Sequence, residues 1–98
     1  IRRLTDFAAM SWAPFFHPSG QKILFTSNHH IDNGRGRVFD IFMVNLDGSD
    51  MKQITHSGTF DGFPMFSNDG TKIAFASNRN VERLESRDTN VFVADWVD

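Results

Sequence analysis

The chain has 98 residues and a mass of 11.2 kDa, which is enough for one small folded domain and too little for two. Its 40% apolar and 22% charged residues exclude a disordered or low-complexity chain. A formal net charge of −2, without runs of like charge, excludes the basic surface of a nucleic-acid-binding protein and a polybasic membrane patch.

Cysteine content and hydropathy exclude further classes. With no cysteine, the chain has no disulfide, no thiolate metal ligand and no cysteine nucleophile. No apolar run approaches the roughly 18 residues of a membrane-spanning helix, so we expect no membrane insertion.

The chain consists of two copies of one unit, offset by 50 positions, as the pairs Lys22 and Lys72, and Pro14 and Pro64, show. The match is closest between 22–28 and 72–78, and it returns between 40–45 and 90–95. A fixed period of this length is typical of repeat architectures such as propellers.

Within each unit, short β-rich runs alternate with turn chemistry, and helical periodicity is absent. In chain order the first unit predicts strands at 12–16, 22–27, 40–45 and 51–55, with an eleven-residue connection at 29–39. The second unit predicts strands at 63–66, 72–77 and 90–95, with a connection at 79–89. Pro14 and Pro64 cannot donate to a ladder and must lie at a strand start or an edge.

The middle strands contain continuous apolar runs at 41–44 and 73–76, which predict that both faces of the sheet are covered. Stacked blades of a β-propeller explain both these runs and the period. A β-sandwich is the alternative, but it explains the runs and leaves the period unexplained.

The second unit reads IT, then DGFPMFSNDGTKIAFASNR over 61–79, and this resembles the repeat of TolB-type propellers, LT followed by DxxPxFSPDGxxIAFxSxR. The first unit is in phase, with Ser11 at the Asp position, HPSG for SPDG and His29 for the final Arg. The resemblance implies an all-β fold of four-stranded antiparallel propeller blades from a six- to eight-bladed ring, in a periplasmic or secreted bacterial protein.

The phase of the repeat predicts how the chain divides. Residues 1–5 correspond to the outermost strand of a preceding blade, 6–55 to repeat 1, and 56–98 to repeat 2 without its outer strand. Two blades would expose apolar faces and strand edges. We therefore expect either further blades in a longer chain or a head-to-tail homo-oligomer, in which residues 1–5 of one copy complete the second blade of its neighbour.

Catalytic and metal-binding motifs are not indicated. His29 and His30 begin a connection with a nearby carboxylate, but adjacent imidazoles rarely converge on one ion and no HExxH-like spacing supports them. No serine lies on a G-x-S-x-G elbow. We expect no cofactor and no enzymatic activity in this chain.

The long connections leave the same edge of their blades, so we predict a binding face there, since loops on a rigid scaffold carry binding residues. Asp61 is expected mainly to staple neighbouring segments, and Arg79 either to pair with a carboxylate of the adjoining repeat or to face a ligand. The candidates for this face are His29, His30, Asp32, Arg35, Asp61, Arg79, Glu82 and Arg83. Their mixed charge suits a protein or peptide partner.

Three functions remain open. The first is a non-catalytic protein-interaction module, as the resemblance to the TolB propeller implies; in that family the propeller docks partners such as the peptidoglycan-associated lipoprotein. The second is an accessory propeller that gates substrate for a prolyl oligopeptidase-class peptidase or a metallopeptidase. The third is a sugar lyase with a His-bound metal at the ring centre, for which four histidines offer no matching constellation.

Overall fold

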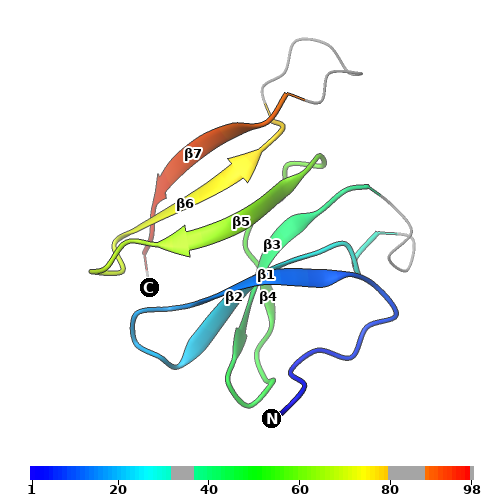
Figure 1. Ribbon diagram of the computed structural model, residues 1–98, viewed down its shortest axis with the longest axis vertical. Coiled ribbons are helices and arrows are strands. Elements are labelled where there is room, and N and C mark those ends of the chain that lie inside the picture. The colour runs from blue at the N-terminus through cyan, green and yellow to red at the C-terminus, as the bar shows by residue number, and fades with distance from the viewer. Residues whose placement is uncertain (32–36, 80–87, 98) are drawn as a thin grey trace.

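The computed structural model describes residues 1–31, 37–79 and 88–97, which form strands and no helix. Two antiparallel sheets lie side by side (Figure 1). Blade 1 contains, in spatial order, β1 (Ser11–Phe16), β2 (Lys22–Ser27), β3 (Asp40–Asn45) and β4 (Lys52–Gln53). Blade 2 contains β5 (Asp61–Phe66), β6 (Lys72–Ser77) and β7 (Asn90–Asp95). The all-β prediction is confirmed.

Most strand bounds agree with the sequence pattern. β2, β3, β6 and β7 have the predicted limits, whereas β1 and β5 begin one and two residues earlier, at Ser11 and Asp61. β4 has two residues where five were expected. Blade 1 has the four strands expected of repeat 1, and blade 2 has, among the described residues, the three expected of repeat 2.

The prolines lie within bulges of edge strands. β1 and β5 are each the first strand of a sheet, and each register shifts once, between Trp12 and Phe15 and between Gly62 and Met65. The residue before each proline, Ala13 or Phe63, has a positive φ of 53° or 54°, which L-residues rarely adopt. The bulge leaves the proline outside the ladder, where its missing N–H removes no hydrogen bond.

The main core lies between the blades. We call the face of each sheet that carries the side chains of Ile23 or Ile73 its front, and the opposite face its back. The back of blade 1 packs on the front of blade 2, and a buried cluster joins the two faces: Leu24, Ile41, Met43, Phe66, Ile73 and Phe75. A second cluster on the front of blade 1 consists of Phe25, Phe42 and Val44, with Phe7 and Ile23 packed against it.

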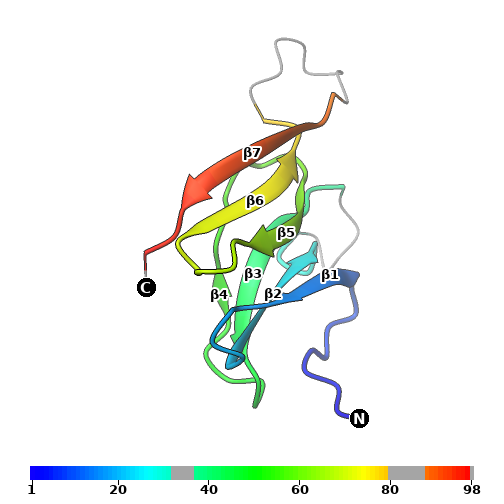
Figure 2. The same ribbon diagram turned by 60° about the vertical axis from the view of Figure 1, so that its left-hand side comes forward.

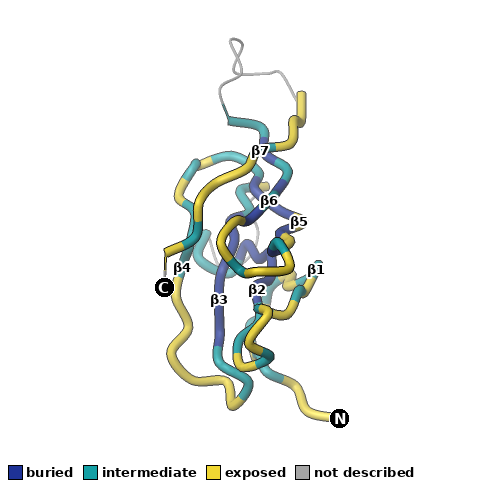
Figure 3. The backbone as a smooth tube through the Cα atoms, turned by 90° about the vertical axis from the view of Figure 1, so that its left-hand side faces the viewer, coloured by how far each residue is buried: buried dark blue, intermediate teal, exposed yellow. Residues whose placement is uncertain are grey.

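The apolar runs are buried to different extents. β3 is buried on both faces, as predicted, because blade 2 covers its back and the second cluster covers its front. β6 alternates between buried and half-buried residues, and β7 is largely exposed, with Val91 79% and Val93 65% accessible. Figure 3 shows this contrast between the dark β3 and the yellow β7.

The crossing from blade 1 to blade 2 is a close backbone approach. Phe39 forms a parallel bridge with Phe60, and the Asp61 amide donates to the Phe39 carbonyl at 2.8 Å. At Gly62 a Cβ atom would lie 3.2 Å from Thr26 Cγ2 and 2.8 Å from Phe60 Cζ. Glycine therefore lets β5 approach β2 of the neighbouring blade.

Candidate functional site

The strand registers place the ends of both long connections on one rim. Ser27 pairs with both Ser11 and Asp40 in blade 1, and Ser77 pairs with both Asp61 and Asn90 in blade 2. We call this edge, which carries residues 28–31, 37–39, 55–60, 78–79 and 88–89, the loop rim. The opposite rim carries the tight turns of 17–20 and 67–70, which Gly20 and Gly70 close at positive φ.

The corner of blade 2 at the loop rim is held by a buried ion pair. Asp61 is fully buried; its Oδ1 accepts from Ser77 Oγ at 2.5 Å and its Oδ2 from Arg79 Nη2 at 2.7 Å. Arg79 Nε also donates to Ser77 Oγ at 2.9 Å, which closes the triangle. Burial acts to raise the pKa of Asp61, but hydrogen bonds from Ser77, Thr55 and Ser57, together with the charge of Arg79, outweigh it, and the pKa is lowered.

The Arg79 guanidinium also packs on aromatic rings. Its Cζ lies 5.0 Å from the ring centroid of Phe75 and 5.7 Å from that of Phe92, within the range of cation–π attraction. Its side chain is 32% exposed. Asp61, Ser77 and the two rings thus fix the guanidinium plane at the rim.

Blade 1 builds the same corner from neutral groups. Ser11 Oγ donates to Ser27 Oγ at 3.2 Å, and Ser27 Oγ donates to the Met10 carbonyl at 2.9 Å. Because the single hydroxyl proton of Ser27 is used in the bond to Met10, Ser27 Oγ acts as the acceptor toward His29 Nδ1 at 2.9 Å. Phe7 stacks on the His29 ring, with centroids 3.9 Å apart and planes 5° from parallel. Burial, helped by the charge of His30, lowers the pKa of His29.

A second buried carboxylate, that of Asp40, lies at the crossing between the blades. Its Oδ2 accepts from His30 Nε2 at 2.9 Å, and its Oδ1 accepts from Thr55 Oγ1 at 3.1 Å and from the Ser57 amide at 3.3 Å. Burial raises the pKa of Asp40; hydrogen bonds from His30 and Thr55 lower it, but the nearby Asp61 raises it further. Asp40 ties the start of β3 to the segment that leads into blade 2.

Sequence reasoning missed Asp40. The available signal was a charged residue directly before the apolar run of β3, at a position where the second unit has Asn90. A carboxylate beside a doubly buried strand must find donors, and these come from the connection to the next blade.

The predicted binding-face residues fall into three groups. His29, His30 and Arg79 lie at the loop rim and are partly exposed, whereas Asp61 is fully buried and holds Arg79 in place. The carboxylate that pairs with Arg79 belongs to the same repeat. Four candidates lie outside the described residues: Asp32, Arg35, Glu82 and Arg83.

Neither a metal site nor a membrane helix is found in the described part of the chain. Among those residues, no three His, Asp or Glu side chains come together in a way that could hold a metal ion. The same residues include no helix with the length and apolar character needed to cross a membrane.

A cleft opens where the blade-to-blade connection passes over the front of blade 2. Its volume is about 420 Å³, within the range of ligand pockets. Arg79, His56 and Ser57 lie on its polar side, and it is otherwise lined chiefly by Ile54, Ile73, Phe75 and Trp96.

The fold has clear counterparts among solved structures. Over 95% of its length, the chain superimposes on a putative TolB from Agrobacterium tumefaciens with a TM-score of 0.75 and 29% identity. TolB from Acinetobacter baumannii matches 96% of the chain with a TM-score of 0.70 and 24% identity, which shows the fold. The chain spans 32% and 21% of the length of these two structures. No family model and no curated protein matches its sequence.

Proposed function

We propose that this chain, which consists of TolB-type β-propeller blades, is a non-catalytic protein-interaction module. The observation that carries this proposal is the exposed back of blade 2. Met65, Val91 and Val93 are 55%, 79% and 65% exposed there, beside half-buried Ala74 and Ala76. A contiguous apolar strand face is typical of a surface that another protein covers.

The repeat itself indicates what fits this face. Fifty positions earlier, Leu24, Ile41 and Met43 form the back of blade 1, and the front of blade 2 buries all three. The exposed back of blade 2 should therefore pack on a surface that resembles the front of a blade. Such a surface is present on blade 1, where Phe16, the counterpart of Phe66, is 58% exposed.

The proposed partner is a second copy stacked head to tail, with the division of the chain that the repeat predicts. Residues 1–5, as the outer strand of a preceding blade, precede repeat 1 (6–55) and repeat 2 (56–98). Leu4 and Thr5 line a cleft together with Ile23 and Phe25, as their counterparts Ile54 and Thr55 line one together with Ile73 and Phe75, which supports this division. Residues 1–5 and β7 lie at opposite ends of the molecule (Figures 1 and 2), so pairing between them requires two copies.

Charge and register favour this pairing. Met43 pairs with Lys52 in blade 1, so the repeat places Arg2 of one copy opposite Val93 of the next. Arg2 and Arg3 then bring two positive charges to the strand that ends in Asp95, which is exposed. Asp95 already pairs with Lys72 at 2.6 Å, and the two arginines add further positive charge beside this carboxylate.

A further protein or peptide partner is proposed for the loop rim, where His29, His30 and Arg79 are partly exposed. The two TolB structures support a periplasmic or secreted location for the chain. Neither structure is described as a peptidase, so the substrate-gating alternative has no supporting observation.

Native mass by light scattering at two dilutions tests the stacking. A six- to eight-bladed ring corresponds to three or four copies of a two-bladed chain, so we expect a stable mass at three or four times 11.2 kDa. Val93→Asp places a charge in the apolar face, so the native mass of this variant should be that of a single copy. Asn68→Asp, in an exposed turn of the opposite rim, is the matched control and should change nothing. A wild-type mass of one copy at both dilutions would contradict the proposed assembly.

A further inference from the structure

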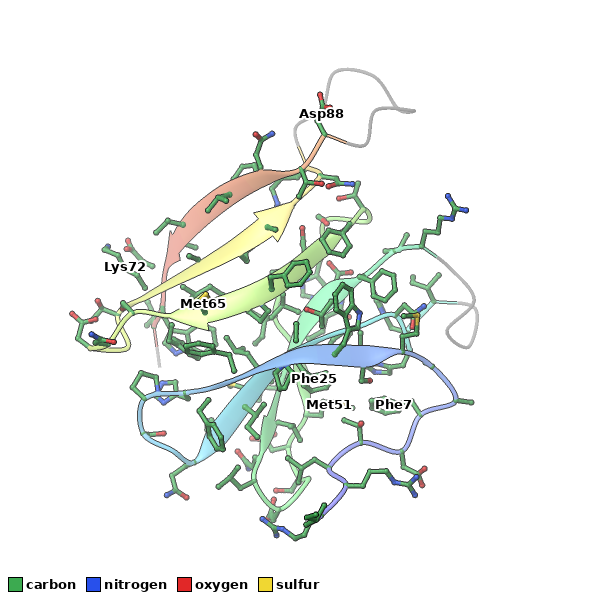
Figure 4. All side chains as sticks on the ribbon, in the orientation of Figure 1. Phe7, Phe25, Met51, Met65, Lys72 and Asp88 are labelled. Atoms are coloured by element: carbon green, nitrogen blue, oxygen red, sulfur yellow. The ribbon has the colours of Figure 1, made fainter. Side chains whose placement is uncertain are left out.

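The rim of blade 1 contains a row of three neighbouring rings. His29 is stacked on Phe7 at a centroid distance of 3.9 Å, and its ring is tilted by 50° against that of Phe42 at 4.5 Å. Phe7 belongs to the segment that enters blade 1, and Figure 4 shows it between that segment and the sheet. An aromatic ring from the entering segment thus covers the outer side of the rim residue.

Blade 2 has the same row without its first ring. The counterparts of Phe42 and His29 are Phe92 and Arg79, and the guanidinium lies 5.7 Å from the Phe92 centroid. The counterpart of Phe7 is Ser57, whose short side chain bonds with Thr59 Oγ1 at 3.0 Å.

The backbones confirm that these segments are equivalent. The Asn28 amide donates to the Met10 carbonyl in blade 1, and the Asn78 amide donates to the Phe60 carbonyl in blade 2. Both entering segments therefore cross their blade in the same register. The difference at the rim is one of side chains, Phe against Ser and His against Arg.

The cleft of about 420 Å³ lies where the missing ring would stand, with Ser57 and Arg79 among its lining residues. On blade 1, a cleft of about 150 Å³ lies between Leu4, Thr5, Ile23 and Phe25 and extends toward Trp12 and Pro14 of β1, and neither Phe7 nor His29 is among its lining residues. The cleft on blade 2 is open to solvent and roomy enough for one aromatic side chain.

We propose that this cleft binds an aromatic side chain from a partner peptide, with the ring stacked on the Arg79 guanidinium opposite Phe92. The flat guanidinium attracts the face of an aromatic ring, and Ile73 and Trp96 supply apolar walls. Asp61 and Ser77 hold the guanidinium, so little side-chain freedom is lost on binding.

An aromatic ring suits this site better than an anion does. Asp61 already neutralises Arg79 through a 2.7 Å ion pair, so a second carboxylate would gain little and would repel the first. A ring uses the face of the guanidinium and leaves that ion pair intact. This inference rests on the proposed function in one respect: the aromatic ring is assigned to a protein partner because the chain is proposed to be a protein-interaction module.

Titration of the whole chain with N-acetyl-phenylalanine amide, followed by amide NMR shifts, tests the site. We expect saturable shifts at Ile54, Ser57, Phe75 and Trp96. N-acetyl-leucine amide should bind about threefold more weakly, because it lacks the cation–π contribution. Arg79→Lys, which keeps the charge and loses the flat face, should remove that preference for the aromatic probe.

The matched variants exchange the side chains at two equivalent positions, Ser57 in blade 2 and Phe7 in blade 1. Ser57→Phe should fill the cleft and weaken probe binding at least tenfold, and Ser57→Leu is a smaller substitution for the case that Phe disturbs folding. Phe7→Ser should leave binding at blade 2 unchanged. Unchanged binding in both Ser57 variants, or no shifts up to the solubility limit of the probe, would overturn the inference.

The two proposals can fail separately. Probe binding by a chain that stays monomeric at both dilutions would keep the cleft and remove the assembly. A stable assembly that does not bind the probe would keep the assembly and remove the cleft as a binding site.

Discussion

The loop-rim corner of blade 1 is held by neutral groups, whereas the same corner of blade 2 is held by a buried ion pair. Ser11, Ser27 and His29 occupy the positions that Asp61, Ser77 and Arg79 occupy 50 residues later. Both sets connect the start of the first strand to the end of the second. The backbone of the repeat thus accepts either chemistry, and the exposed side of the corner varies with it.

The largest expected effect comes from breaking the charged corner. Asp61→Ala leaves Arg79 without its buried partner and should lower the free energy of unfolding by about 2–4 kcal/mol. Ser11→Ala, the matched change in blade 1, removes one neutral hydrogen bond and should cost about 0.5–1 kcal/mol. Urea denaturation measures both.

A double variant that gives blade 2 the neutral side chains of the blade 1 corner sharpens the comparison. In the double variant Asp61→Ser with Arg79→His no charge is left buried alone, so we expect it to be more stable than Asp61→Ala by at least about 1 kcal/mol. Equal losses in the two proteins would mean that the ion pair is not the source of the difference between the corners.

The close approach between blades gives a smaller effect. Gly62→Ala should cost about 1–2 kcal/mol, because the new methyl group meets Thr26 and Phe60. Thr26→Ser removes the methyl group that lies 3.2 Å away and should recover part of the loss in the Gly62→Ala background. Gly20→Ala has open space around it and a φ of 75°, so its cost should come from the backbone and be unaffected by Thr26→Ser.

The smallest effect is the pH dependence of the neutral corner. The pKa of His29 is lowered in the folded chain, so its stabilising contribution is complete above the unfolded value of 6.5 and is lost as the pH falls below it. Stability should therefore fall on acidification by under about 1 kcal/mol more in the wild type than in His29→Gln. Parallel pH profiles of the two proteins would contradict this assignment.

The sequence predicted those features that depend on local pattern. Period, turn residues and apolar runs placed β2, β3, β6 and β7 at their observed limits. The partner of Arg79 was not predicted, because the sequence left open a carboxylate of the adjoining repeat or a ligand, whereas the structure pairs Arg79 with Asp61 of the same repeat.

Features that depend on how the connections fold back over the strands escaped sequence reasoning. Asp40 gains His30, Thr55 and Ser57 as partners only when the connection folds back over β3. The stack of Phe7 on His29 depends on the path of the entering segment. Neither contact follows from the local pattern of the residues, although nearly all of these partners belong to repeat 1.

Cysteine cross-linking tests front-to-back stacking most directly, because the chain has no cysteine of its own. Met43 and Phe66 share the cluster between the blades, so the repeat places Val93 of one copy near Phe16 of the next. A short bis-maleimide should join Val93→Cys to Phe16→Cys in a mixture, with one variant tagged, and should join neither variant to itself. Equal cross-linking within the single variants, or none in the mixture, would contradict the stacking of these blades.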